Sequence, residues 1–155
     1  MTLDDALTAY TAGLDAELEI LRQVESLAHN QRAMFARAEI VDLAGVATRR
    51  AELMHQLAAV EAKLEPWRTR IVANLPTARR SAAFPAAESR GQDVQVLVRR
   101  LMDHDRRLLT DLEVTLEARR REAHDLETGG ATLAAYRRVV APSLAQAGGL
   151  VDSRG

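Results

Sequence analysis

The chain lacks cysteine altogether, which excludes disulfides, thiolate nucleophiles, cysteine-ligated zinc and iron–sulfur clusters. Aromatic residues are scarce, at 3% of the 155 residues, and ligand pockets depend on aromatic walls, so we expect no roomy small-molecule or cofactor site. No stretch approaches the ~18 apolar residues of a membrane span. The acidic start of the chain shows no signal peptide. These features predict a soluble, cytoplasmic protein with no membrane insertion and no cofactor.

An excess of charge of one sign is missing as well, because the formal net charge is only −1. Basic residues are almost all arginine, with Lys63 the single lysine, and the arginines between residues 99 and 121 alternate with acidic residues. Mixed charge of this kind usually marks a solvated helix face, so we expect no nucleic-acid partner. Hydrophobic residues at 47% and charged residues at 28% predict one globular domain.

The first stripe of apolar residues predicts a helix from about residue 3 to about residue 39. Its members repeat in steps of three and four, and five of them are spaced seven apart: Leu7, Leu14, Leu21, Ala28 and Phe35. This spacing is typical of a helix with coiled-coil character. Thr2 can cap the helix, and Gly13 inside it costs roughly 1 kcal/mol against alanine.

A second stripe predicts a helix over about 43–74, with Asp42 as its N-cap. Two interleaved seven-residue series run along it, and Arg50 occupies the one place that is not apolar. We expect Pro66 to kink this helix or restart it, because its ring displaces the bond to the carbonyl four residues back. The short connection around residues 40–41 makes the first two helices an antiparallel pair.

Residues 76–91 are rich in proline, serine and alanine, and predict a flexible linker. A third helix is expected over about 93–128, with Asp93 as its cap, and the pair Gly129-Gly130 is expected to end it.

The simplest fold for these stripes is all-α. We predict an elongated antiparallel three-helix bundle, or coiled coil, over residues 1–130, followed by a flexible C-terminal tail over residues 131–155. The residues expected inside the bundle are apolar members of the three stripes: Leu14, Leu21, Leu53, Leu57, Val60, Leu64, Leu101, Leu108 and Leu112.

Candidate catalytic residues are few. Glu52 and His55 have the spacing used in di-iron bundles, but such sites need a second Glu-x-x-His pair and the sequence has none. The run Asp103-His104-Asp105 is rich in ligand side chains, yet successive residues point in different directions around a helix, so we expect it on the surface. No P-loop, glycine-rich dinucleotide turn or nucleophile elbow is present in the sequence. We therefore predict no catalytic residue, no metal site and no enzyme activity.

The three predicted helices can cover one another's apolar stripes without the tail. The apolar side chains of the tail are therefore a surplus. They are spaced for one face of a short amphipathic segment: Leu133, Tyr136, Val139, Val140 and Leu144. Two interpretations stay open from the residues alone. The segment docks on its own bundle, or it binds a partner helix in the helix-in-groove mode.

Several segments of the chain have residue patterns similar to those of one known family. They are the opening helix with spaced acidic residues (14–21), the segment 42–64 with a basic pair midway, and the arginine- and leucine-rich helix 101–126. The end of the chain adds a glycine pair, a short apolar spacer, a Tyr-Arg pair at Tyr136 and an Asp-x-Arg ending at Asp152. Together these segments resemble the FlgN-type flagellar export chaperones, which belong with the type III secretion helpers.

The resemblance implies a small cytoplasmic chaperone without ATPase activity. Such proteins hold the C-terminal helix of hook-associated (hook–filament junction) subunits and deliver these subunits to the export gate. Tyr136 stands at the position that contacts the export gate in the family. The client-binding residues implied are Leu126, Leu133, Val139, Val140 and Leu144.

Other classes of function remain open at this point. One is a structural coiled-coil adaptor without chaperone activity, and another is an enzyme built on a helical bundle. The sequence does not identify the client or the oligomeric state.

Overall fold

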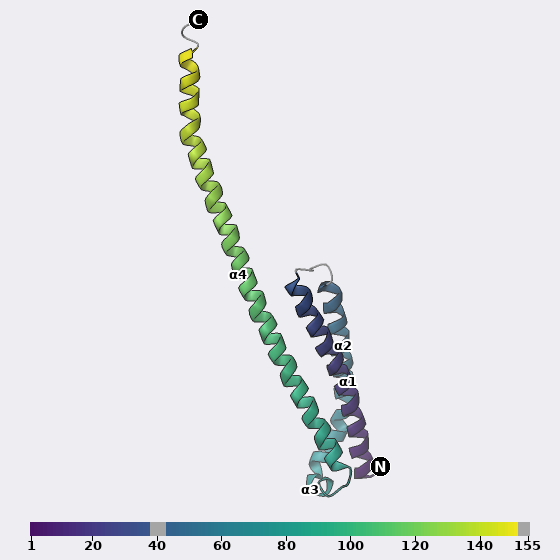
Figure 1. Cartoon of the computed structure of the whole chain (residues 1–155). Helices are drawn as coiled ribbons and strands as arrows, with labels where there is room; N and C mark the ends of the chain where they lie inside the picture. The colour runs from purple at the N-terminus through teal and green to yellow at the C-terminus, as the bar shows by residue number, and fades with distance from the viewer. Residues whose placement is uncertain (38–42, 152–155) are drawn as a thin grey trace. The chain divides into compact units, whose positions relative to one another are not determined.

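The computed structural model describes residues 1–37 and 43–151, and the side chains of residues 139–151 lie outside the description. The fold is all-α, as predicted, and the helices are α1 (Leu3–Ala36), α2 (Leu43–Ala73), α3 (Leu75–Ala78) and α4 (Phe84–Val151) (Figure 1). The chain divides into two compact units, which we call unit 1 (Met1–Leu108) and unit 2 (Leu109–Gly155). Asp42, the predicted cap of the second helix, lies outside the described residues.

A capping box starts α1, and Thr2 is its N-cap as predicted. The Thr2 hydroxyl accepts a hydrogen bond from the backbone N–H of Asp5 (3.1 Å), and the Asp5 carboxylate accepts one from the backbone N–H of Thr2 (2.7 Å). These bonds satisfy donors that the helix itself leaves without an acceptor. The bond from the Thr2 backbone also holds the pKa of Asp5 below its usual value.

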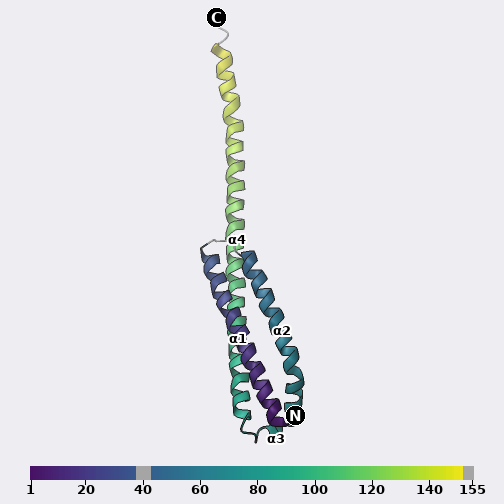
Figure 2. The same ribbon diagram turned by 90° about the vertical axis from the view of Figure 1, so that its right-hand side faces the viewer.

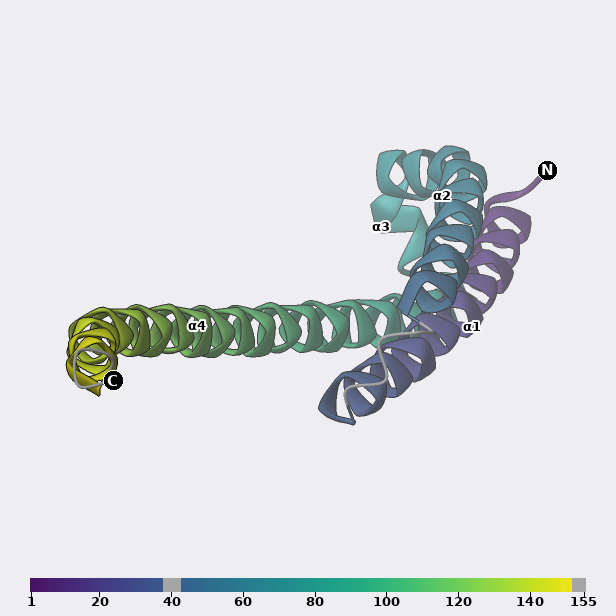
Figure 3. The ribbon, with the colours of Figure 1, turned by 90° about the horizontal axis from the view of Figure 1, so that it is seen from above.

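Unit 1 is built from α1, α2, α3 and the first part of α4. α1 and α2 run antiparallel and lie side by side in all three views (Figure 1, Figure 2 and Figure 3). Arg90 pairs with Asp15 (2.6 Å) and Arg100 with Glu25 (2.5 Å). The partners in both ion pairs are 75 residues apart, so the first part of α4 runs parallel to α1.

Two apolar clusters form the core of unit 1. The larger cluster joins α1, α2 and α4, and its buried members are Leu18, Ile20, Leu21, Val24, Leu53, Leu97 and Leu101. The smaller cluster takes one residue from each of the four helices: Leu7, Ile71, Ala78 and Ala87. The removal of these stripes from water is the main force that holds the helices of unit 1 together.

Most of the predicted core residues are buried, namely Leu14, Leu21, Leu53, Leu64, Leu101 and Leu108. Leu57 and Val60 are half-buried and pack against the edge of the larger cluster. Leu112, which belongs to unit 2, is also half-buried.

The close packing of α2 against α1 explains why a glycine, Gly13, stands within the stripe of α1. A Cβ atom at this position would lie only 2.2 Å from Cδ2 of Leu64 on α2. The glycine therefore allows a close approach that a larger residue would prevent.

The prediction of a linker over residues 76–91 is wrong in its extent, because only residues 79–83 lie between α3 and α4. α3 has Pro76 in its first turn, and α4 begins at Phe84 with Pro85 next. Proline is tolerated there because the first N–H groups of a helix have no intrahelical acceptor and the ring fixes φ near the helical value. The alanines that follow are good helix formers, so α4 starts earlier than the predicted cap, Asp93.

The prediction that the glycine pair ends the third helix is also wrong. α4 continues through Gly129 and Gly130 to Val151, so most of the predicted tail is helical, and residues 152–155 lie outside the described residues. Each glycine costs roughly 1 kcal/mol in a helix interior, but the alanine-, leucine-, glutamate- and arginine-rich segments on both sides favour the helix.

None of the helices in the described part of the chain combines the length and the apolar character that crossing a membrane requires.

Candidate partner-binding surface

Unit 2 exposes large apolar side chains along α4. The exposed fraction is 51% for Leu116, 77% for Leu126, 60% for Leu133 and 67% for Tyr136. Single exposed leucines are ordinary, but several along one helix usually mark an interaction surface.

The leucines of this surface share one coiled-coil register. Steps of three and four residues alternate along α4 without a change of phase, and we call these positions the α4 stripe: Leu109, Leu112, Leu116, Arg119, Ala123, Leu126, Gly130, Leu133 and Arg137. In heptad notation, Leu109 and Leu116 are at a positions, and Leu112 and Leu126 are at d positions. The stripe therefore passes through the glycine pair without losing its register.

A shallow hollow lies over the glycine pair. Its volume is about 920 Å³, and leucines, glycines, threonines and acidic residues line it: Glu122, Asp125, Leu126, Thr128, Gly129, Gly130, Thr132 and Leu133. A Cβ atom at either glycine would meet nothing within 4 Å. The backbone of α4 is thus open at this point, and a side chain of another helix can approach it closely.

The structure brings two of the predicted client-binding residues onto this surface. Leu126 and Leu133 are both at d positions, and Tyr136 lies beside the stripe at a g position. The side chains of Val139, Val140 and Leu144 lie outside the described residues.

Sequence reasoning missed the first half of the surface. It assigned Leu112 to the bundle interior and ended the helix at the glycine pair, so the stripe of the third helix was not continued to Leu133. The signal that identifies the whole surface is the unbroken spacing through Ala123 and Gly130.

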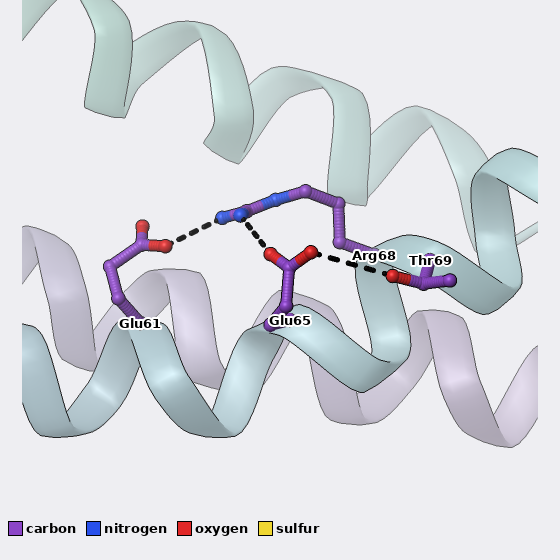
Figure 4. A network of polar contacts seen from close by, with 4 residues as sticks. All are labelled: Glu61, Glu65, Arg68 and Thr69. Carbon is purple, nitrogen blue, oxygen red and sulfur yellow. Dashed lines mark hydrogen bonds and ion pairs between the residues drawn. The ribbon is translucent and has the colours of Figure 1, made fainter.

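A second candidate site is a polar network on α2, in the turns around Pro66. Arg68 pairs with Glu61 (2.9 Å) and with Glu65 (2.7 Å), and the Thr69 hydroxyl donates a hydrogen bond to Glu65 (3.5 Å) (Figure 4). Pro66 stands inside α2, which neither ends nor restarts there. The ion pairs of Arg68 span the turn in which the proline removes a backbone hydrogen bond.

Glu17 of α1 adds a buried carboxyl group to this network. It is only 5% exposed, and its Oε2 atom has no hydrogen-bond partner. Burial, helped by the hydrogen bond and the charge of Glu61, raises the pKa of Glu17 to about 7. Burial acts in the same direction on Glu61, but hydrogen bonds with Arg68 and Glu17 hold the pKa of Glu61 below its usual value. A protonated Glu17 can therefore donate to an ionised Glu61 near neutral pH.

A third candidate is a basic groove of about 530 Å³ between α1 and α4 in unit 1. Arginines and histidines dominate its lining: Glu25, His29, Arg32, Val96, Arg99, Arg100, Leu101, Asp103, His104 and Arg107. The rings of His29 and His104 meet edge to face, with centroids 5.2 Å apart. Burial, together with the charges of His29 and Arg32, lowers the pKa of His104.

The expectation that the run Asp103-His104-Asp105 lies on the surface is only partly correct. Asp103 is exposed, but His104 and Asp105 are half-buried. Asp105 accepts a charged hydrogen bond from Arg50 (2.5 Å), which links α2 to α4. This pair explains why an arginine interrupts the apolar series of α2.

The Glu-x-x-His pair does not form a site in the described structure. Glu52 and His55 are both exposed, and Glu52 pairs with Arg49 (3.1 Å). Among the described residues, no three histidine, aspartate or glutamate side chains gather closely enough to hold a metal ion.

No family model matches this chain, and comparisons with curated proteins and with solved structures find no match either. Function is therefore inferred from the α4 stripe and from the residues of the sequence.

Proposed function

We propose that this protein is an export chaperone of the FlgN type, which binds an amphipathic helix of its client through the α4 stripe. The observation that carries the proposal is the exposure of Leu126 and Leu133 at matching positions of one continuous helix. Complete burial of a leucine contributes roughly 1.5–3 kcal/mol, so a helix that covers both gains several kcal/mol before the cost of ordering.

The client is the terminal helix of a hook-associated subunit, as the sequence resemblance implies. Such a helix packs into a filament after export, and before assembly its apolar face is open to aggregation. The α4 stripe offers a face that can cover it in the cytoplasm, without any catalytic step. Tyr136, exposed beside the stripe, is the residue proposed to contact the export gate.

Binding of hook-associated subunits, with and without their last helix, tests the proposal. We expect the intact subunits to bind and the shortened subunits to bind at least about tenfold more weakly, measured by isothermal titration calorimetry. The double variant Leu126→Asp/Leu133→Asp should show a similar loss, because it places two charges in the contact.

Val114→Asp is the matched control, because Val114 is 65% exposed on the opposite face of the same helix, at an f position. It should leave binding unchanged. Equal binding of intact and shortened subunits, or an equal loss in the control, would contradict the proposal. Tyr136→Ala should keep client binding and reduce export of the client.

The coiled-coil register of the α4 stripe also favours a second function, that of a structural adaptor. An adaptor would bind a partner helix through the same stripe but would show no preference for hook-associated subunits. A pull-down with these subunits in competition with other coiled-coil proteins separates the two functions.

A further inference from the structure

We propose that the α4 stripe pairs antiparallel with the α4 stripe of a second copy of this chain, with Ala123 of one copy opposite Leu126 of the other. This pairing follows from the register and charges of α4 and does not depend on the identity of the client.

The register opposes a large residue to a small one in the two layers nearest its centre. In an antiparallel coiled coil, each a residue faces a d residue of the other helix. With Ala123 opposite Leu126, the neighbouring layers place Leu116 opposite Leu133 and Arg119 opposite Gly130. The open backbone at Gly130 leaves room for the Arg119 stem, while its guanidinium extends to the edge of the pair. Twofold symmetry repeats each layer.

Charges on the flanks match in the same register. The e positions face each other in an antiparallel pair, and here Arg120 of each copy faces Glu127 of the other. Both residues are exposed and have no ion-pair partner in the described part of the chain. At the g positions, Glu122 faces Gly129, so these flank positions bring no like charges together.

A shift by one heptad in either direction loses this match. One shift places Arg120 against Arg120 and Glu122 against Glu122 of the second copy. The other places Glu127 against Glu127, and Arg119 against Arg137. Like charges at these positions oppose pairing.

A parallel, in-register pair is also disfavoured. It would place Arg119 against Arg119 at the centre of the contact and Glu122 beside Glu127 at its edge. Among these arrangements, the proposed one alone has opposite charges at its e positions.

Self-pairing and client binding use the same stripe and are therefore competing states. In the protein without client, the second copy covers Leu126 and Leu133, and a client must displace this copy.

Sedimentation equilibrium of the full chain tests the pairing. We expect the wild type to form a dimer at micromolar concentrations, and Arg120→Glu to weaken it by about tenfold or more, because two ion pairs become two repulsive pairs. The double variant Arg120→Glu/Glu127→Arg restores the pairs with reversed sign and should recover the dimer. Arg121→Glu makes the same charge change one residue away, at an f position, and should have little effect.

Disulfide cross-linking tests the direction and register, because the chain contains no cysteine of its own. Chains with Ala123→Cys are mixed with chains carrying Leu126→Cys under mild oxidation. We expect cross-links between the two variants to form faster than cross-links within either one. A parallel pair would give the reverse order and would overturn the proposal. A wild-type monomer at 100 μM, or equal effects of the substitutions at Arg120 and Arg121, would overturn it as well.

Discussion

At the scale of a single residue, the buried carboxyl group of Glu17 makes the stability of unit 1 depend on pH. Its pKa is about 7 in the folded protein and near 4.5 when it is exposed in the unfolded chain. Between these values the folded state holds a proton that the unfolded state has lost. The contribution of Glu17 to stability is therefore fully present below the unfolded pKa and decreases as the pH rises to about 7.

Glu17→Gln should remove this dependence, because glutamine can still donate to Glu61 but does not ionise. At pH 8 we expect the variant to be more stable than the wild type by about 1–2 kcal/mol, with a much smaller difference at pH 5. Urea unfolding at the two pH values measures the effect. Glu19→Gln, an exposed position on the same helix, is the control. Equal shifts at both pH values would show that Glu17 is ionised in the folded protein throughout this range.

Residues such as Glu17 and Arg50 could not be assigned from the sequence. Glu17 stands among other acidic residues of a helix, and its burial depends on where Glu61 of α2 lies. Arg50 looked like a gap in an apolar series, and its partner Asp105 is 55 residues away. Contacts of this kind depend on the packing of helices, which periodicity alone does not specify.

At the scale of the helix, glycines have opposite effects at different positions. Gly13 is in close contact with Leu64, whereas a Cβ atom at Gly91 in α4 would meet nothing within 4 Å. The intrinsic preference for alanine over glycine in a helix is the same at both sites, so packing decides the result.

Gly91→Ala should stabilise the protein by about 0.5–1 kcal/mol through helix propensity. Gly13→Ala should destabilise it by about 1–3 kcal/mol, because the new methyl group pushes Leu64 away from α1. Thermal unfolding of both variants, followed by circular dichroism, measures the difference. Stabilisation by Gly13→Ala would mean that α1 and α2 are farther apart than described.

Helix periodicity predicted α1 and α2 to within a few residues, because long apolar stripes leave little choice of fold. The errors came from proline and glycine. Pro76 and Pro85 suggested a linker but occupy first turns of helices, where their missing N–H is not needed. The surplus of apolar residues in the tail left open whether Leu133 docks on the bundle or binds a partner, and the continuity of the stripe across the glycine pair was not predicted.

At the scale of the whole molecule, the two units differ in how they are stabilised. Unit 1 contains both apolar clusters of the described residues, whereas residues 113–138 of unit 2 contain no buried residue. Folding of unit 1 should therefore not require the end of α4.

Truncation after Gly130 should leave the free energy of unfolding of unit 1 within about 0.5 kcal/mol of the wild type. It should also weaken partner binding by about tenfold or more, because Leu133 and the rest of the α4 stripe beyond Gly130 are removed. Stability is best measured at low protein concentration, where self-pairing adds little. A large loss of stability would show instead that the removed segment docks on its own bundle.

The glycine pair inside an exposed helix has a kinetic consequence. Two adjacent glycines weaken the helix locally by roughly 2 kcal/mol against two alanines, so α4 should open there more often than elsewhere along its length. Amide hydrogens near Gly129 and Gly130 then exchange with solvent quickly while the stripe is uncovered, and slowly once another helix lies across it. The amide exchange rate at these two residues therefore reports the fraction of chains whose α4 stripe is covered by another helix.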